Sequence, residues 1–152
     1  MAFYQLASKQ IIPAGIEEVW NFISSPGNLK EITPDYLDFD ITSKDLPEKI
    51  YPGMIIIYKV KPLLGIPLSW VSEITHIVEN QFFVDEQRIG PYAFWHHQHL
   101  IESFEKGVLM TDIISYMPPL SFLGSLANKL FIRKHLARIF SYRENAIKKR
   151  FP

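Results

Sequence analysis

The sequence predicts an α+β fold in which a curved, seven-stranded antiparallel sheet wraps around one long C-terminal helix. Two observations predict it. Between residues 36 and 117 apolar residues recur with a period of two, and turn-forming residues separate the runs at hairpin distances. After residue 122 the apolar residues recur at helical spacing instead. With 152 residues, the chain has the size of a single domain, 1–152.

The N-terminal part predicts one strand and then two short helices. Residues 2–12 alternate like a strand, which Pro13 closes. Residues 16–24 carry acids in their first turn and an apolar stripe at helical spacing that includes Trp20, which we expect in the core. Residues 28–32 can form one further helical turn.

Six further strands are expected to form an antiparallel meander, because the turns between them are short. Turn sequences such as Pro52-Gly53 and Gly90-Pro91 separate them. The predicted strands are 36–42, 54–61, 67–78, 81–88, 91–104 and 107–117.

The last element is a proline-free amphipathic helix over residues 122–150. Its apolar stripe includes Leu126, Leu130, Phe140 and Ile147. At ~1.5 Å per residue the helix is about 40 Å long, enough to cover the concave face of the sheet. A long helix that rests on a strongly bent sheet leaves a cavity between the two.

Composition excludes several classes of protein. Apolar residues make up 47% and charged residues 21%, which is typical of a packed core rather than a disordered chain. Sixteen basic and sixteen acidic residues balance, so we expect no nucleic-acid partner. The absence of cysteine excludes disulfides, thiolate zinc sites and iron–sulfur clusters. No secretory signal or spanning segment of about 20 apolar residues is present, so we expect a cytoplasmic protein.

Polar side chains that could carry chemistry gather on two neighbouring strands. A period of two places Trp95, His97 and His99 on one face of the 91–104 strand, and Asp112 and Tyr116 on one face of the next. Both faces of the 91–104 strand are mixed, so polarity alone does not tell which one points inward. An inward Asp112 beside either histidine would form a carboxylate–imidazole pair.

The chain resembles the START-like superfamily, also called SRPBCC or polyketide cyclase/dehydrase-like, which has the helix-grip fold. The resemblance covers nearly the whole chain. Within the superfamily, the chain is most similar to a bacterial subfamily of unknown activity. It implies a cavity for a hydrophobic ligand and an inward orientation of Trp95, His97 and His99, but no particular reaction. It rests on the element order and on residues 12–20, Asp85-Glu86-Gln87, Gly90-Pro91-Tyr92, Trp95-His96-His97-Gln98-His99, Thr111-Asp112 and 131–134.

Four interpretations of the histidine cluster compete. The one we favour is a buried hydrogen-bond network that also recognises the polar end of a ligand. The second is acid–base catalysis, with His97 or His99 as the base and Asp112 orienting it. The third is a metal site, for which Glu86 or Asp112 would have to supply the third ligand. The fourth is that the histidines face solvent. Asp85 could supply a further partner, and we expect neither a metal nor another cofactor.

We expect the ligand-binding residues to come from the concave face and from the helix, although ordinary core packing competes for the aromatic ones. The apolar turn 62–68 is expected to fold over the mouth of the cavity. The expected ligand-binding residues are Tyr58, Trp70, Ser72, Trp95, His97, His99, Asp112, Tyr116, Leu126 and Leu130.

The preferred function is binding of a small hydrophobic molecule such as a lipid, isoprenoid, polyketide or aromatic compound, without catalysis. The first alternative is a cyclase- or hydratase-like enzyme that uses the His/Asp pair. The second is a regulatory or membrane-surface module, because residues 118–152 hold eight Lys and Arg but only one acid, Glu144. A scaffold helix that shows its solvent face explains the same charge pattern, so a membrane surface ranks behind the small molecule.

Overall fold

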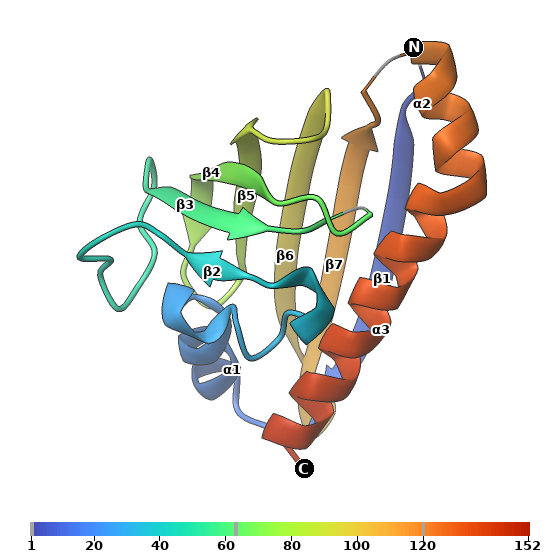
Figure 1. The fold of residues 1–152 in the computed structure, drawn as a ribbon. Coiled ribbons are helices and arrows are strands. Elements are labelled where there is room, and N and C mark those ends of the chain that lie inside the picture. Colours follow the sequence, from blue (N-terminus) through green and yellow to red (C-terminus); the bar gives the residue numbers. More distant parts are fainter. Residues whose placement is uncertain (1, 63, 120) are drawn as a thin grey trace.

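The structure is a computed structural model that describes residues 2–62, 64–119 and 121–152. It confirms the predicted α+β architecture, with one antiparallel sheet in the order β1-β7-β6-β5-β4-β3-β2 (Figure 1). The strands are β1 (Tyr4–Ile12), β2 (Asp40–Ile41), β3 (Ile55–Val60), β4 (Leu68–Val78), β5 (Phe82–Ile89), β6 (Phe94–Phe104) and β7 (Gly107–Met117). The helical elements are α1 (Ile16–Ile23), η1 (Pro26–Asn28), η2 (Asp35–Leu37), α2 (Ser121–Ala127), η3 (Asn128–Ile132) and α3 (Arg133–Arg150).

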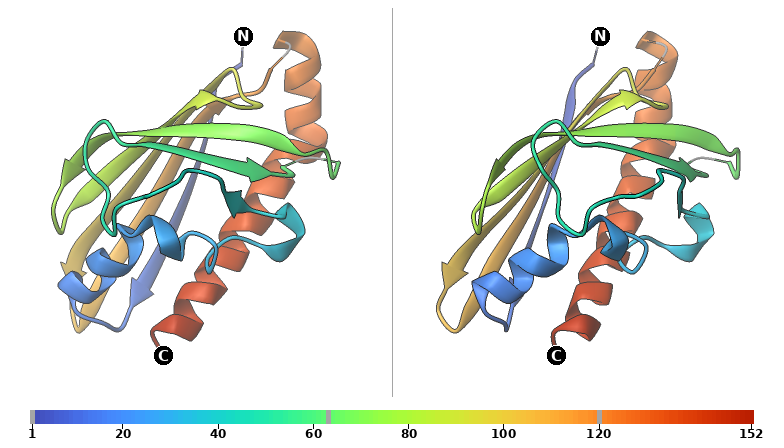
Figure 2. Two further views of the ribbon diagram at one scale, coloured as in Figure 1. Left: turned by 60° about the vertical axis from the view of Figure 1, so that its left-hand side comes forward. Right: turned by 90° about the vertical axis from the view of Figure 1, so that its left-hand side faces the viewer.

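The sheet is strongly curved, and α3 runs along its open side (Figure 2). Two groups of buried apolar side chains fill the space between them. One surrounds Trp20 and Phe83, whose rings meet edge to face at 6.1 Å, and the other surrounds Trp70 and Leu136. The buried position of Trp20 agrees with the expected core role.

The predicted 36–42 strand is the largest error along the sheet. Only β2 pairs with β3, because Asp35–Leu37 form a 3₁₀ turn and Asp38 follows with a left-handed φ of 48°. This turn is still tied to the sheet, since the Lys61 N–H donates to the carbonyl of Leu37 at 2.7 Å.

Residues 91–93 also lie outside the strand predicted for them. The side-chain amide of Gln87 holds this loop: its Nε2 donates to the Tyr92 carbonyl at 2.7 Å, and its Oε1 accepts from the Tyr92 N–H at 3.1 Å. Any side chain at Gly90 would collide with that amide. The Asp-Glu-Gln and Gly-Pro-Tyr patterns therefore form one structural unit.

The C-terminal helix differs from the prediction in its phase. η3 is a π-helical segment between α2 and α3. A π turn contains more residues than an α-helical turn, so the residues before it are rotated about the helix axis relative to α3. Ile132 and Leu136 consequently face the core, whereas Leu126 and Leu130 are each 49% exposed. Among the described parts of the chain, no helix combines the length and hydropathy needed to cross a bilayer.

Candidate ligand cavity and its polar cluster

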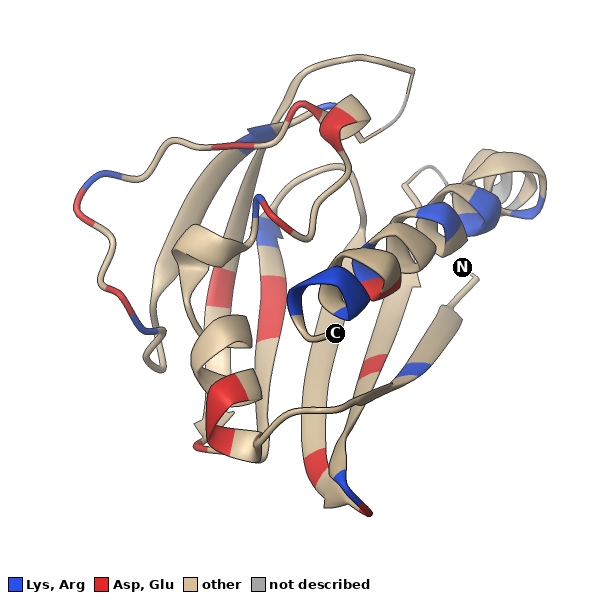
Figure 3. Cartoon of the chain, turned by 90° about the horizontal axis from the view of Figure 1, so that it is seen from below, with Lys and Arg blue, Asp and Glu red and all other residues tan. Residues whose placement is uncertain are grey.

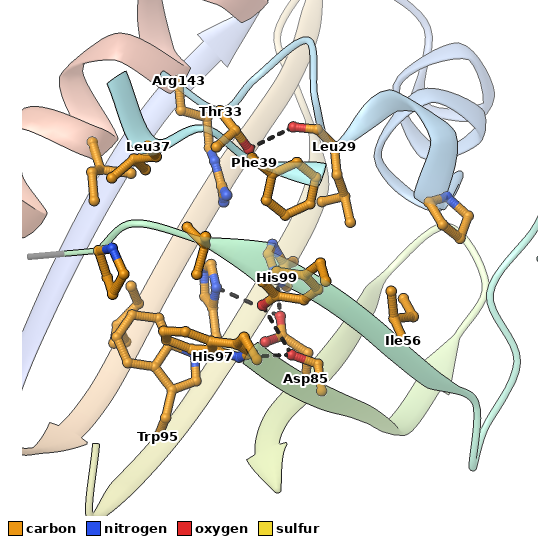
Figure 4. A pocket seen from close by; sticks show the side chains of 18 of the residues that line it. Leu29, Thr33, Leu37, Phe39, Ile56, Asp85, Trp95, His97, His99 and Arg143 are labelled. Atoms are coloured by element: carbon orange, nitrogen blue, oxygen red, sulfur yellow. Dashed lines mark hydrogen bonds and ion pairs between the residues drawn. The ribbon is translucent and has the colours of Figure 1, made fainter. Parts of the chain in front are cut away.

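A cavity of about 160 Å³ lies between the concave face of the sheet and α3 (Figure 4). Its wall is mostly apolar and aromatic. Ile56, Tyr58, Trp70 and Phe83 contribute from the sheet, and Leu136 and Phe140 contribute from α3. An apolar cavity of about 150 Å³ in another protein holds one benzene molecule, so this cavity matches a compact ligand of about one ring.

Six of the residues predicted for ligand binding line the cavity. Ser72 ties the aromatic wall together, because its Oγ accepts from Trp70 Nε1 at 3.1 Å and lies 3.2 Å from the Tyr58 hydroxyl. The rings of Trp70 and Trp95 meet edge to face at 5.2 Å. The six residues are Tyr58, Trp70, Ser72, Trp95, His97 and His99.

The other four predicted residues are not part of the cavity wall. Leu126 and Leu130 face outward because of the helix phase described above. Tyr116 is only 1% exposed, and its hydroxyl donates to Asn128 Oδ1 at 2.7 Å, so it serves the core. Asp112 lies behind the two histidine rings rather than against the cavity space.

Strand register brings the two histidines between two carboxylates. Asp85 on β5 lies opposite His97 on β6, and His99 lies opposite Asp112 on β7. His97 Nε2 donates to Asp112 Oδ1 at 2.9 Å, and His99 Nε2 donates to Asp85 Oδ2 at 2.6 Å. His99 Nδ1 lies 3.0 Å from Asp112 Oδ1, and His97 Nδ1 lies 3.6 Å from Asp85 Oδ2.

Burial and these contacts shift the proton affinities in opposite directions. Burial and the positive charge of His99 lower the pKa of His97 to about 4. Burial also acts to lower the pKa of His99, but contacts with Asp112 and Asp85 outweigh it and raise that pKa. Burial acts to raise the pKa values of Asp85 and Asp112, yet the neighbouring histidines hold both pKa values below the usual range. Of the two imidazoles, His99 is the one whose positively charged form its surroundings favour, because both of its ring nitrogens lie within 3.0 Å of a carboxylate oxygen.

Arg143 is a cavity residue that the sequence interpretation counted only as part of the basic helix. Its guanidinium reaches from α3 toward His97 and His99 (Figure 4), with Nη1 3.7 Å from Asp112 Oδ1. Its Nε and Nη1 are buried and have no hydrogen-bond partner among the described residues. The spacing from Phe140 and Ile147, three and four residues away on the buried face, could have indicated this orientation.

Two further expectations are corrected or only partly met. Glu86 cannot serve as a metal ligand beside His97, since it lies on the opposite face, where its Oε1 is 2.7 Å from His96 Nδ1. Of the apolar turn 62–68, Pro62 lines the cavity but Leu64 is 95% exposed, and Leu63 lies outside the described residues.

No family model and no curated protein sequence matches the chain. Solved structures match it over almost its whole length. The protein TTHA0849 from Thermus thermophilus gives a TM-score of 0.70 at 15% identity, covering 97% of both chains. Major latex-like protein 151 from Panax ginseng gives 0.67 at 11% identity, covering 99% of this chain and 98% of that one. Ara h 8.0201 gives 0.60 at 13% identity, covering 97% and 99%.

At these identities the likeness concerns the fold alone. Its extent agrees with the element order and with the position of α3 across the curved sheet. The chain therefore has the helix-grip fold that its resemblance to START-like proteins predicted.

Proposed function

We propose that this protein binds a compact hydrophobic molecule that carries a hydrogen-bond acceptor such as a carbonyl oxygen. The observation that supports this most is a mostly apolar cavity of about 160 Å³ lined by the Arg143 guanidinium, two nitrogens of which have no hydrogen-bond partner in the part of the chain that the structure describes. The volume favours a small aromatic compound over a long lipid, isoprenoid or polyketide chain. Burial of the ring supplies most of the affinity, at ~25 cal/mol per Å² of apolar surface before the costs of association.

Arg143 supplies the recognition of the ligand's polar end. A buried N–H without an acceptor costs about 1–3 kcal/mol, and more when the group is charged, so a ligand oxygen that accepts from Arg143 recovers this energy. Asp112 does not compete fully for these donors, because its Oδ1 lies 3.7 Å from Nη1 and already accepts from His97. The ligand oxygen then lies beside the histidine cluster.

His135 offers a second polar contact along the same helix. Its Nε2 is buried in the cavity lining and has no hydrogen-bond partner among the described residues. It lies two helical turns before Arg143, about 12 Å away along the axis. A ligand of about one ring is too short to reach both residues, so a compact ligand bound at Arg143 does not contact His135.

The test compares two ligands of nearly the same shape, acetophenone and α-methylstyrene, which differ by a carbonyl oxygen in place of a CH₂ group. Tryptophan fluorescence titration gives both dissociation constants in the wild type and in Arg143→Met. The substitution should weaken acetophenone relative to α-methylstyrene by about tenfold or more, as loss of a hydrogen bond to a charged group does. If neither compound binds the wild type, or if the ratio of the two constants does not change, this function is refuted.

The enzymatic alternative has less support from the same geometry. General bases work best with a pKa near the operating pH, whereas the pKa of His97 is about 4. Both nitrogens of His99 already contact carboxylates. These observations favour binding without turnover.

A second candidate function rests on the outer surface of α2, η3 and the first turn of α3. The apolar side chains of Leu123, Leu130 and Phe131 are exposed there, and Lys129 and Arg133 lie among them. Lys and Arg gather along the C-terminal helix (Figure 3). Basic amphipathic surfaces of this kind bind anionic lipid.

Vesicle co-sedimentation tests the second candidate. The double substitution Lys129→Glu/Arg133→Glu should abolish binding to phosphatidylserine vesicles. Lys149→Glu, near the far end of the helix, should lower binding only slightly. Wild-type protein that stays in the supernatant at low salt would exclude this role.

A further inference from the structure

The polar end of the cavity brings together three groups that each offer one metal-ligating atom. These are Asp85, His97 and His99, and the three atoms lie within 4.8 Å of one another. We propose that these residues bind one divalent transition-metal ion of the Zn²⁺ or Fe²⁺ type. The proposal departs from the expectation of no metal, and it does not depend on the proposed hydrophobic ligand, because it concerns protein groups alone.

Asp112 provides the second observation that points to a metal. Its Oδ1 contacts the far nitrogen of each ring, His97 Nε2 at 2.9 Å and His99 Nδ1 at 3.0 Å. A carboxylate only accepts, so these nitrogens carry the hydrogens, and His97 Nδ1 and His99 Nε2 become the ligating atoms on the side of Asp85. Metal-bound histidines in proteins are held in this way by a carboxylate on the opposite ring nitrogen.

The backbone and the neighbouring aromatic rings fix the geometry before any ion arrives. The two histidines point to the same side of β6, and Asp85 comes from the adjacent position of β5. The His99 ring stacks on Phe83 at 4.1 Å, and the His97 ring packs against Phe140 at 5.9 Å. Rigid strands therefore position all three ligands, as a preorganised site requires.

Two histidines and one carboxylate leave coordination positions open. Catalytic zinc sites and non-haem iron(II) sites share this donor set and use the open positions for water or a small molecule. Here all three donor residues line the cavity, so the open positions face its interior. On binding, the ion takes the place of the proton between His99 Nε2 and Asp85 Oδ2, which lie 2.6 Å apart.

The structure also supplies a matched control. His96, next to His97 on β6, has its Nδ1 2.7 Å from Glu86 Oε1, but this pair faces away from the cavity. It is a histidine–carboxylate pair on the same two strands, and the outward faces of β5 and β6 carry no second histidine. His96→Gln should therefore leave metal binding unchanged.

The experiment uses the full chain without a histidine tag, treated with a chelator and then titrated with Co²⁺ as a visible-absorbing probe and with Zn²⁺ by calorimetry. We expect one ion per chain and d–d absorption bands in the wild type. Asp85→Asn and His99→Gln should weaken binding by about 100-fold or more, as loss of a direct ligand does, and Asp112→Asn by about 10–100-fold. Circular dichroism establishes that each variant is folded.

A wild-type protein with neither d–d bands nor stoichiometric Zn²⁺ binding overturns the proposal whatever the variants do. Binding that survives Asp85→Asn and His99→Gln in folded protein, or that His96→Gln removes, overturns it as well. The ligand titrations under Proposed function are made on chelator-treated protein, so failure of the metal site leaves their outcome unaffected.

Discussion

Filling the cavity should stabilise the protein, whereas the same change in the packed core should destabilise it. Val60 on β3 lines the cavity, and Val108 on β7 is buried in the core away from the cavity. Val60→Phe places a ring into cavity space that no side chain of the protein fills. Val108→Phe forces the same ring into close-packed side chains.

The structure gives the magnitudes. At ~24 cal/mol per Å³, a volume of about 160 Å³ that no side chain fills corresponds to about 4 kcal/mol of lost packing. Phe adds about four carbons to Val, worth about 3 kcal/mol, from which about 1 kcal/mol is lost by ordering the ring. Val60→Phe should therefore raise the free energy of unfolding by about 1–2 kcal/mol, and Val108→Phe should lower it by about 1–3 kcal/mol.

Urea denaturation of both variants measures the difference, and the wild type with acetophenone provides the comparison. Val60→Phe should also abolish acetophenone binding, since the ring occupies its place. If both variants lose stability equally, the space between the sheet and α3 is filled in solution and the reasoning about the cavity is refuted.

Three further outcomes are expected. Tyr116→Phe should lower the free energy of unfolding by about 1–3 kcal/mol, because Asn128 Oδ1 loses its donor, yet leave ligand binding unchanged; a change in acetophenone affinity would contradict this. Leu130→Ser should change the free energy of unfolding by less than about 0.5 kcal/mol, whereas Leu136→Ala should lower it by about 2–5 kcal/mol, both measured by urea denaturation. Similar losses in the two variants would contradict the finding that Leu136 faces the core and Leu130 faces outward. In the metal-free protein, His97 should protonate only near pH 4 rather than near 6.5, because its pKa is lowered. The unfolded chain binds this proton first, so the free energy of unfolding falls as the pH drops from about 6.5 to about 4. An NMR titration of the His97 ring with a midpoint near 6.5 would disprove this.

The sequence predicted the architecture well because the fold depends on patterns that repeat along the chain. Alternation and turn residues located six of the seven strands to within a few residues. The exception is the predicted 36–42 strand, which Asp38 interrupts. The left-handed φ of Asp38 ends a 3₁₀ turn inside an apolar alternation that otherwise fits a strand, and alternation alone does not reveal such a backbone reversal.

The site was predicted only in part, because it depends on contacts between distant elements. The period of two grouped His97 with His99, and the family resemblance gave their inward face. Asp85 enters the cavity through the β5–β6 register, which single-strand patterns do not determine. Arg143 was missed because long cationic side chains are usually exposed. Leu126 was placed on the wrong face because the π-helical segment rotates the residues before it relative to α3. A regular helical period over the whole helix does not reveal such a local rotation.

The three tryptophan indoles report on ligand binding inside the cavity, because Trp70 and Trp95 line it whereas Trp20 belongs to the core and not to the lining. Two-dimensional NMR of ¹⁵N-labelled protein resolves their indole N–H signals during a titration with acetophenone. We expect the signals of Trp70 and Trp95 to shift, the signal of Trp20 to stay in place, and Val60→Phe to abolish both shifts. Unchanged signals at Trp70 and Trp95, or shifts that persist in Val60→Phe, would contradict a ligand-binding cavity between the sheet and α3.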